Sequence, residues 1–403
     1  MKILSVNAGS SSLKFTLFDM PAGNELIGGY FEKIGLDDSF YSIKINGEKT
    51  KKVAKVSNHS DAVKILIDEL IENKIISSLD ELDGVGHRLV HGGEKYTDSV
   101  LIDEDVINTV TELIPLAPLH NPANLIGVKA FMEALPNTPN VGIFDTAFHQ
   151  TMSKEQYLYS VPYSWYEDYK IRKYGFHGTS HKFITKSMKE ILGKEDINII
   201  VCHIGSGGSL CAVKDGKSFD TTMGFTPNAG IMMGTRSGDI DYTMIPYVMK
   251  ESGMSLNEVD NALNKQSGLL GVSGFSDSRD VENAVAEGNE LAVLANDMYI
   301  NKIANYIAQY YVELEGNLDA MVLTAGVGEN GAAFRKALLE RIACLGVKVN
   351  DEVNDTIAAF KSVHSGIITR EDSKFPVYVL PTNEELMIAT DTFDIINKLK
   401  RVC

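Results

Sequence analysis

The chain has 403 residues, of which 44% are hydrophobic and 23% are charged, with 34 glycines and 11 prolines. This composition is typical of a soluble α/β enzyme, excludes a fibrous or low-complexity protein, and at this length favours two domains. The formal net charge of -16 argues against nucleic acid or an anionic membrane as a partner, since both attract clustered lysine and arginine. No run of about 20 apolar residues predicts a membrane span. The spacing of the cysteines suits neither a metal site nor a disulfide framework, and we therefore expect a cytoplasmic protein. These cysteines are Cys202, Cys211, Cys344 and Cys403.

The sequence N-A-G-S-S-S-L-K at residues 7–14 lies between two short apolar runs, residues 3–6 and 15–18, and predicts a hairpin of two strands. Its Gly/Ser turn offers backbone N–H groups and hydroxyls, and Lys14 adds a cation, a combination that suits a phosphate. An ordinary serine-rich turn has the same composition. Residues 27–30 and 41–45 predict further strands, the second followed by an Asn46-Gly47 turn, and Ser60 is expected to cap a helix.

Arg88 lies among histidines and glycines in G-H-R-L-V-H-G-G, residues 86–93. A guanidinium binds carboxylate or phosphate bidentately, and adjacent glycines let a ligand approach the backbone; a surface ion pair is the alternative. All histidines except His59 and His364 lie between His87 and His203, which favours a common cleft.

Asp145 directly follows an apolar strand in I-F-D-T-A-F-H, residues 143–149, where α/β proteins place catalytic groups, although a helix N-cap would also suit it. His120 lies in a proline-stiffened loop, A-P-L-H-N-P, residues 117–122. In Y-G-F-H-G-T-S-H, residues 174–181, the spacing of His177 and His181 would suit a zinc pair on a helix. The glycines favour a loop instead, in which an imidazole donates a hydrogen bond to a transferring phosphoryl group.

The hairpin pattern recurs. Residues 197–201 predict a strand, residues 203–209 a Gly/Ser turn and residues 210–213 a returning strand. Farther on, Arg236 in M-G-T-R-S-G and Arg279 in an acidic turn could clamp an anion, and residues 294–314 predict a long core or interface helix.

A third version runs from a strand at residues 321–324 through a glycine turn at 325–330 into a helix, but it lacks the third glycine of a dinucleotide fingerprint. Residues 377–380 predict a last strand, and T-N-E-E at 382–385 opens a final helix. Glu384 there is either a partner of the helix dipole or a ligand of Mg²⁺.

These ordered motifs, with T-A-G-V-G-E-N at 324–330 and P-T-N-E-E at 381–385, span the chain and resemble the acetate kinase family; propionate and butyrate kinases share parts of the pattern. The resemblance implies an α/β fold with two duplicated actin-like, ribonuclease H-like domains and a central cleft, related to sugar kinases and Hsp70. Residues 1–149, completed by the C-terminal helix 386–403, would form the acyl-substrate domain. Residues 150–385 would form the nucleotide-binding and dimerisation domain.

The resemblance also implies residue roles. The catalytic residues would be Arg88, Asp145, His177 and Arg236. Arg88 would also bind the acyl substrate, together with Val90, Leu119, His120, Phe176 and Pro227. Asn7 and Glu384 would hold Mg²⁺, or Mn²⁺ in its place. The residues implied for ATP or ADP are Ser10, Ser12, Lys14, His203, Ile204, Gly205, Ser206, Gly207, Asp277, Ser278, Arg279, Gly326, Val327, Gly328, Glu329 and Asn330.

The implied activity is the reversible, direct, Mg²⁺-dependent transfer of a phosphoryl group from ATP to acetate, giving acetyl phosphate and ADP, by a cytoplasmic homodimer of acetyl-CoA biosynthesis. The first alternative is a kinase for propionate or another short-chain acid. An actin-like or Hsp70-like ATPase is less favoured, because it has no use for cations around a small-anion pocket.

Two departures from the family pattern concern the nucleotide. Ser206 stands where the second phosphate loop, usually H-L-G-N-G, has asparagine, and the loop Ser276–Arg279 is one residue shorter than usual.

If Arg88 and Arg236 are anion ligands, replacing either by alanine is expected to reduce catalysis far more than stability.

Overall fold

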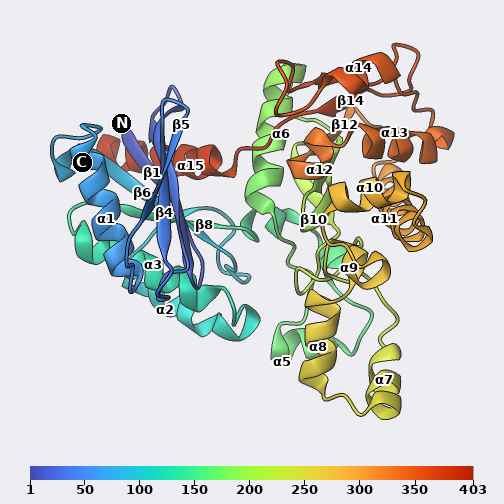
Figure 1. Cartoon of the computed structure of the whole chain (residues 1–403), viewed down its shortest axis with the longest axis horizontal. Helices are drawn as coiled ribbons and strands as arrows, with labels where there is room; N and C mark the ends of the chain where they lie inside the picture. The colour runs from blue at the N-terminus through green and yellow to red at the C-terminus, as the bar shows by residue number, and fades with distance from the viewer. Residues whose placement is uncertain (403) are drawn as a thin grey trace. The chain divides into compact units, whose positions relative to one another are not determined.

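The computed structural model describes residues 1–402, so Cys403 lies outside it, and the chain divides into two compact units (Figure 1). Unit 1 contains Met1–Gln150 and the segment from Asn383 onward, and unit 2 contains Thr151–Thr382. The substrate and nucleotide roles expected for the two domains stay predictions.

Unit 1 contains an eight-stranded sheet in the order β5-β4-β3-β2-β1-β6-β8-β7. Its strands are β1 Lys2–Ala8, β2 Ser12–Asp19, β3 Asn24–Glu32, β4 Phe40–Ile45, β5 Glu48–Val53, β6 Leu82–Leu89, β7 Val100–Leu101 and β8 Asn140–Phe144. Its α-helices are α1 His59–Glu72, α2 Glu104–Glu112, α3 Asn121–Ala134 and α15 Glu384–Val402. Short 3₁₀ turns are η1 Leu79–Glu81, η2 Ile114–Leu116 and η3 Ala147–Thr151.

Alternation along β1 divides the hydrophobic core of unit 1 between the two faces of the sheet. Leu4 and Val6 join the cluster that includes Phe131 of α3, whereas Ile3 joins the cluster that includes Ile388 of α15. Helices therefore cover both faces, and the last helix returns to the first strand (Figure 1).

Two glycines of β6 allow α15 to approach the sheet closely. A Cβ atom at Gly84 would lie 2.1 Å from Ile396 Cδ1, and one at Gly86 would lie 2.2 Å from Thr392 Oγ1. A side chain at either position would force the helix away from the sheet. This close packing fixes the start of α15, where Glu384 lies, relative to β6.

Unit 2 contains a six-stranded sheet in the order β11-β10-β9-β12-β14-β13. Its strands are β9 Ile199–Ile204, β10 Gly208–Lys214, β11 Lys217–Thr221, β12 Ala320–Thr324, β13 Gly366–Ile367 and β14 Val377–Val379. Its helices are α4 Lys154–Tyr157, α5 Tyr163–Tyr169, α6 Gly178–Leu192, α7 Met244–Ser252, α8 Leu256–Lys265, α9 Gly268–Ser273, α10 Ser278–Ala286, α11 Glu290–Glu313, α12 Ala325–Asn330, α13 Ala332–Arg341, η4 Ala343–Leu345 and α14 Asp351–Thr356. In Figure 1, α6 and α11 lie on opposite sides of this sheet, and both contact β9.

The two sheets repeat one topology. In unit 1, β1, β2 and β3 pair antiparallel, and β6 and β8 continue the sheet in parallel from β1. In unit 2, β9, β10 and β11 pair antiparallel, and β12 and β14 continue in parallel from β9. The predicted duplicated actin-like α/β fold is confirmed.

The hairpins predicted at residues 3–18 and 197–213 are both present, as β1–β2 and β9–β10. The Asn46-Gly47 turn is also confirmed: Ile45 pairs with Glu48, and the two turn residues have φ values of 51° and 85°. The predictions of the long helix and of the last strand and helix are confirmed by α11, β14 and α15.

Three local predictions are wrong. The cap of α1 is Asn58, whose extended backbone lets its side chain accept from Asp61 N–H, whereas Ser60 already lies inside the helix. His181 lies in α6 rather than in a loop, because the glycine-rich segment turns into the helix as early as Gly178. The third glycine turn is itself a short helix, α12, which starts directly after β12.

Among the described residues, no helix combines the length and the apolar character that crossing a membrane requires. Cys202, Cys211 and Cys344 are free thiols, the first two buried and the third exposed.

Stability should fall in mild acid because of one buried histidine of β6. His87 Nε2–H donates to Asn140 Oδ1 at 2.7 Å, and burial lowers the pKa of His87 to about 4, which this hydrogen bond only partly opposes. Below the ordinary histidine pKa of about 6.5, His87 binds a proton in the unfolded protein but stays neutral in the folded protein until the pH approaches 4. Its contribution to stability is therefore present above that pH and is lost as the pH falls.

Between pH 7.5 and pH 5, His87 should account for a loss of about 2 kcal/mol in the free energy of unfolding. Glutamine cannot titrate in this range. When urea unfolding is measured at both pH values, the free energy of unfolding of His87→Gln should therefore fall by about 2 kcal/mol less than that of the unmodified protein. His364→Gln, at an exposed position, is the control and should match the unmodified protein. Equal losses in all three proteins would contradict the assignment.

Candidate active site

The turn between β1 and β2 is held open by backbone contacts in unit 1. Gly9 N–H donates to Ser12 O at 2.9 Å, and His59 Nε2–H donates to Gly9 O at 2.8 Å. Asn7 and Lys14 lie directly opposite each other in the hairpin, so their side chains share one face of the sheet. An amide and an ammonium group thus lie beside a Gly/Ser turn whose Ser10 is exposed.

Arg88 and Asp145 meet at one edge of the unit 1 sheet because they end neighbouring parallel strands, β6 and β8. Arg88 Nε donates to Asp145 Oδ1 at 3.1 Å, its Nη2 forms an ion pair with Oδ2, and its Nη1 lies 3.4 Å from Asn7 Oδ1. Burial alone would lower the pKa of Arg88, but Asp145 and Glu384 more than offset it and raise the pKa. Arg88 is therefore neither a surface ion pair nor an unengaged anion ligand: its fork is oriented by a buried carboxylate.

Glu384 is the first residue of α15 and carries an unusual carboxylate. Its Oε1 is buried and has no hydrogen-bond partner in the structure. Burial raises the pKa of Glu384 to about 7; Arg88 opposes this shift, and Asp145 and Glu385 add to it. The neighbouring Glu385 instead forms an ion pair with Lys14.

A cavity of about 460 Å³ in unit 1 is lined by Asn7, Ser12, Lys14 and Arg88, among others. No group of three or more His, Cys, Asp or Glu residues within residues 1–402 has the arrangement of a metal site. The buried, unpartnered Glu384 oxygen and the Asn7 amide oxygen are nevertheless the kind of donor that Mg²⁺ accepts when phosphates supply its other ligands.

Three histidines of unit 2 are joined by hydrogen bonds and ring stacking. Ser209 Oγ lies 2.9 Å from His177 Nδ1 and 2.8 Å from His181 Nε2, and Ser180 Oγ lies 2.8 Å from His203 Nδ1. The His177 and His203 rings stack with their centroids 4.2 Å apart. This group fixes the imidazole of His177, which occupies a left-handed backbone conformation at the start of α6.

Arg236 and His177 converge on the turn between β9 and β10. A Cβ atom at Gly207 would lie 3.3 Å from Arg236 Nη1 and 3.7 Å from His177 Nε2. Arg236 Nη1 donates to Pro227 O at 3.4 Å, and the guanidinium forms no ion pair with a carboxylate among the described residues. Burial lowers the pKa of Arg236, so an anion bound here would relieve an uncompensated positive charge.

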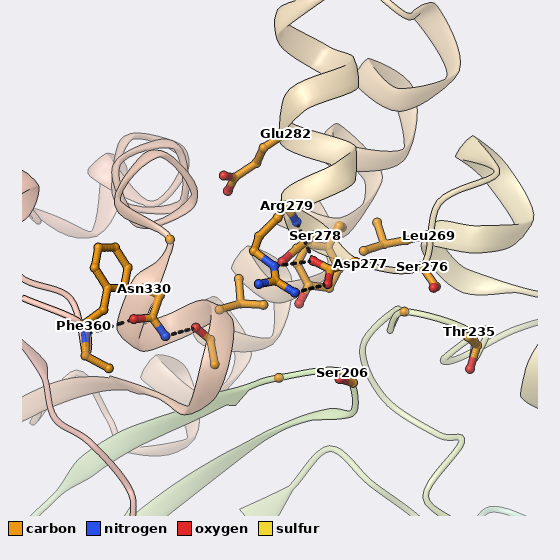
Figure 2. A pocket seen from close by; sticks show the side chains of 17 residues that line it. Ser206, Thr235, Leu269, Ser276, Asp277, Ser278, Arg279, Glu282, Asn330 and Phe360 are labelled. Carbon is orange, nitrogen blue, oxygen red and sulfur yellow. Dashed lines mark hydrogen bonds and ion pairs between the residues drawn. The ribbon is translucent and has the colours of Figure 1, made fainter. Parts of the chain in front are cut away.

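A larger cavity, of about 880 Å³, lies within unit 2 (Figure 2). Several residues that the sequence assigns to the nucleotide line it together: Gly205, Ser206, Asp277, Ser278, Arg279, Gly326, Val327 and Asn330. The cavity lining does not include His203, Ile204, Gly207, Gly328 or Glu329. Ile204 is fully buried, and Arg279 is ion-paired with Asp277. The binding roles of all these residues stay predictions.

The side-chain carboxylate of Glu329 accepts hydrogen bonds from the protein backbone. Its Oε1 accepts from Ala325 N–H at 2.8 Å and from Thr382 N–H at 3.1 Å, and it lies 3.3 Å from Thr324 Oγ1. This carboxylate therefore ties the start of α12 to the last residue of unit 2.

The residues predicted for the acyl group are distributed over both units. Val90 is buried and its N–H donates to Asn124 Oδ1, Leu119 is 75% exposed, and His120 is the residue that precedes α3. In unit 2, Phe176 is buried, and Pro227 O accepts from Arg236.

Sequence reasoning missed Ser180, Ser209 and Thr382, which hold the histidines and the carboxylate of Glu329, and Leu269, Tyr299 and Phe360, which line the large cavity. Ser180 and Ser209 lie inside motifs that were singled out, and their nearness to histidines was the available signal. Thr382 also lies inside such a motif, P-T-N-E-E, although nothing there pointed to its contact with Glu329. No pattern in the sequence pointed to Leu269, Tyr299 or Phe360.

Duplicated sheets of this topology, each with a Gly/Ser hairpin between its first two strands, define the class of proteins with a duplicated actin-like fold. The sequence profile of the acetokinase family matches residues 2–390, and the chain belongs to this family. The acetate kinase of Geobacillus kaustophilus (strain HTA426) is 52% identical over 399 residues, which cover 98% of this chain and 99% of the relative.

Solved structures agree. The crystal structure of Porphyromonas gingivalis acetate kinase has a TM-score of 0.93 and 44% sequence identity, covering 98% of this chain and 99% of that one. A propionate kinase from Francisella tularensis subsp. tularensis SCHU S4 has a TM-score of 0.91 and 40% identity, with the same coverage.

The two arginines should differ when replaced by alanine. Arg236→Ala should reduce kcat/KM by about 2–4 kcal/mol of transition-state stabilisation, with little change in the free energy of unfolding, because no buried carboxylate loses a partner. Arg88→Ala should in addition destabilise the protein, by roughly 3 kcal/mol, since Asp145 is 1% exposed and would lose its cation. The sequence led us to expect that Arg88→Ala would have little effect on stability, and the buried ion pair with Asp145 revises this expectation.

Steady-state kinetics and urea unfolding of both variants test this difference. The matched control is the double variant Arg88→Ala/Asp145→Asn, which should regain part of the lost stability but no activity. Near-normal kcat/KM in Arg236→Ala would remove this residue from the site.

Proposed function

We propose that this protein is an acetate kinase, which transfers the γ-phosphoryl group of ATP to acetate and releases acetyl phosphate and ADP, reversibly. The observation that carries this proposal is the uncompensated guanidinium of Arg236 beside His177 and the Gly205–Gly207 turn. A cation and an imidazole at a glycine turn suit the equatorial oxygens of a phosphoryl group in transfer.

The transfer needs little proton chemistry from the protein. Acetate is ionised near neutral pH, so its oxygen attacks the γ-phosphorus directly, the new carboxylate–phosphorus bond forms, and the bond to the ADP oxygen breaks. Asp145 then has no proton to remove. Its bidentate contact with Arg88 supports a positioning role, in which the guanidinium is oriented toward the anionic substrate.

The nucleotide would occupy the large cavity of unit 2, with its phosphates toward the Gly205-Ser206 turn. Lys14 and the Ser10 and Ser12 hydroxyls are proposed to bind phosphate as well. Mg²⁺, held by Glu384 and Asn7, would neutralise phosphate charge when bound. Support comes from the buried oxygen of Glu384 that lacks a partner.

Acetate-dependent release of ADP from ATP tests the proposal. We expect release to require both acetate and Mg²⁺ and to be accompanied by acetyl phosphate, which hydroxylamine traps as the hydroxamate. ADP release that is independent of acetate would indicate an actin-like or Hsp70-like ATPase instead.

A kinase for propionate is the second candidate, favoured by the structural similarity to a propionate kinase. We propose that Val90 limits the length of the acid, because it is buried two residues after Arg88 and its backbone is fixed by Asn124. A side chain fixed in this way cannot move aside for a longer acid, and overpacking costs about 1–3 kcal/mol.

The unmodified protein should therefore prefer acetate to propionate and propionate to butyrate, as measured by kcat/KM. Val90→Ala should narrow the difference between acetate and propionate, since each accommodated methylene contributes about 0.8 kcal/mol, without changing the KM for ATP. A preference for propionate in the unmodified protein would overturn the choice of acid and leave the acyl kinase chemistry standing.

We further propose a cytoplasmic homodimer. Helices α7 and α8 contact each other in unit 2 (Figure 1). Together with α5 and adjacent residues, they expose large apolar side chains: Trp165, Tyr169, Tyr242, Tyr247 and Leu256. A second copy of the chain would cover them. Sedimentation velocity should show a dimer that Tyr247→Asp converts to monomer; a monomer at all concentrations would contradict the proposal. The cytoplasm supplies ATP, and the free thiols suit its reducing conditions.

A further inference from the structure

An exposed aromatic ring lies at the large cavity of unit 2. Phe360 is 78% exposed, although it lines the same cavity as the Gly205-Ser206 turn (Figure 2). Figure 2 shows Phe360 and Asn330 on one side of the cavity and Leu269 and Ser276 on the other. The ring adds an aromatic face to the cavity lining, and sites for small molecules are lined mainly by hydrophobic and aromatic side chains.

The backbone that carries Phe360 is attached to helix α12 by a side chain of the cavity wall. Ala359 N–H donates to Asn330 Oδ1 at 2.9 Å, and Asn330 Nδ2–H donates to Gly326 O at 2.8 Å (Figure 2). Both ends of the Asn330 amide are thus engaged by the backbone. Asn330 positions the ring relative to Gly326 and Val327 on the cavity wall.

A fully buried guanidinium makes a second attachment. Arg335 donates from Nε to Asn354 Oδ1 at 2.8 Å, from Nη1 to Gly328 O at 3.2 Å and Glu329 O at 2.8 Å, and from Nη2 to Asn354 O at 2.8 Å and Ile357 O at 2.9 Å. Every N–H of the group has an acceptor, and together these acceptors join α12 to the segment that leads into Phe360. The ring is exposed, but the chain on either side of it is held.

Other parts of the cavity lining offer apolar surface to a ring system. Leu269, Tyr299 and Val327 contribute apolar surface, and the charges of Asp277 and Arg279 are paired with each other at 2.5 Å. A ligand ring in this space would contact these apolar side chains. The polar glycine turn lies at the Ser206 end of the cavity (Figure 2).

We propose that Phe360 is the residue on which the purine of the bound nucleotide stacks, held in place by Asn330 and Arg335. The inference rests on the proposed function, which places ATP in this cavity, and adds the residue that binds its base. Stacking uses the π-face that every base has, so this contact contributes to the binding of ATP and GTP alike.

Isothermal titration of ADP and GDP with Mg²⁺, without acetate, measures the contact independently of catalysis. Phe360→Ala should raise the Kd of both nucleotides by about fivefold to tenfold, and Phe360→Trp should retain or tighten binding. Inorganic tripolyphosphate, which has no base, should have the same inhibition constant against ATP in the unmodified protein and in Phe360→Ala. Val363→Ala is the matched control, because Val363 is exposed on the same loop but does not line the cavity.

Kinetics complete the test: Phe360→Ala should raise the KM for ATP by the same factor and leave kcat and the KM for acetate unchanged. A Kd for ADP within twofold of the unmodified value would overturn the inference, as would an equal loss of tripolyphosphate binding, which would mean that the ring supports the loop and not the base. If the unmodified protein releases no ADP in response to acetate, the proposed function fails, whereas the titrations with ADP and GDP still decide the role of Phe360.

Discussion

A chain with a formal net charge of -16 can hold an anionic substrate only where it fixes cations locally, and the two glycine-flanked arginines show two ways of doing so. Arg88 is oriented by the buried carboxylate of Asp145, with which it makes bidentate contacts. Among residues 1–402, Arg236 has only neutral acceptors, the carbonyl of Pro227 and the sulfur of Met233, and its positive charge is not compensated by a carboxylate. The ion pair with Asp145 orients the guanidinium of Arg88, whereas the uncompensated charge of Arg236 attracts an anionic ligand.

Glycine makes both arrangements accessible. At Gly207, any side chain would lie in contact with Arg236 and His177, in the place where a ligand must approach. In β6, Gly84 and Gly86 allow α15 to pack against the sheet, so that Glu384 at its start lies close enough to Arg88 for their charges to interact. Glycines that seem unremarkable within a strand thus position a carboxylate that is remote in sequence.

The sequence predicts well those parts of the fold that depend on local patterns. Apolar runs around Gly/Ser turns correctly predicted both hairpins, β1–β2 and β9–β10, and the ordered motifs identified the family. The errors at Ser60 and His181 are shifts at helix starts, where one residue's backbone conformation decides the outcome. Contacts made in the folded chain were out of reach: nothing in the sequence shows that Ser209 joins two histidines, that Glu329 binds the backbone at Thr382, or that Phe360 lies at a cavity formed with Ser206.

If the protein transfers a phosphoryl group from ATP to acetate, a carboxylate oxygen of acetate becomes bonded to phosphorus. The most direct measurement is ³¹P NMR of the products formed from ATP, Mg²⁺ and acetate labelled with ¹⁸O in its carboxylate. We expect an acetyl phosphate resonance shifted by one ¹⁸O in the bridging position, with ADP formed in equal amount. Unlabelled inorganic phosphate as the phosphorus product, formed at the same rate with or without acetate, would contradict it.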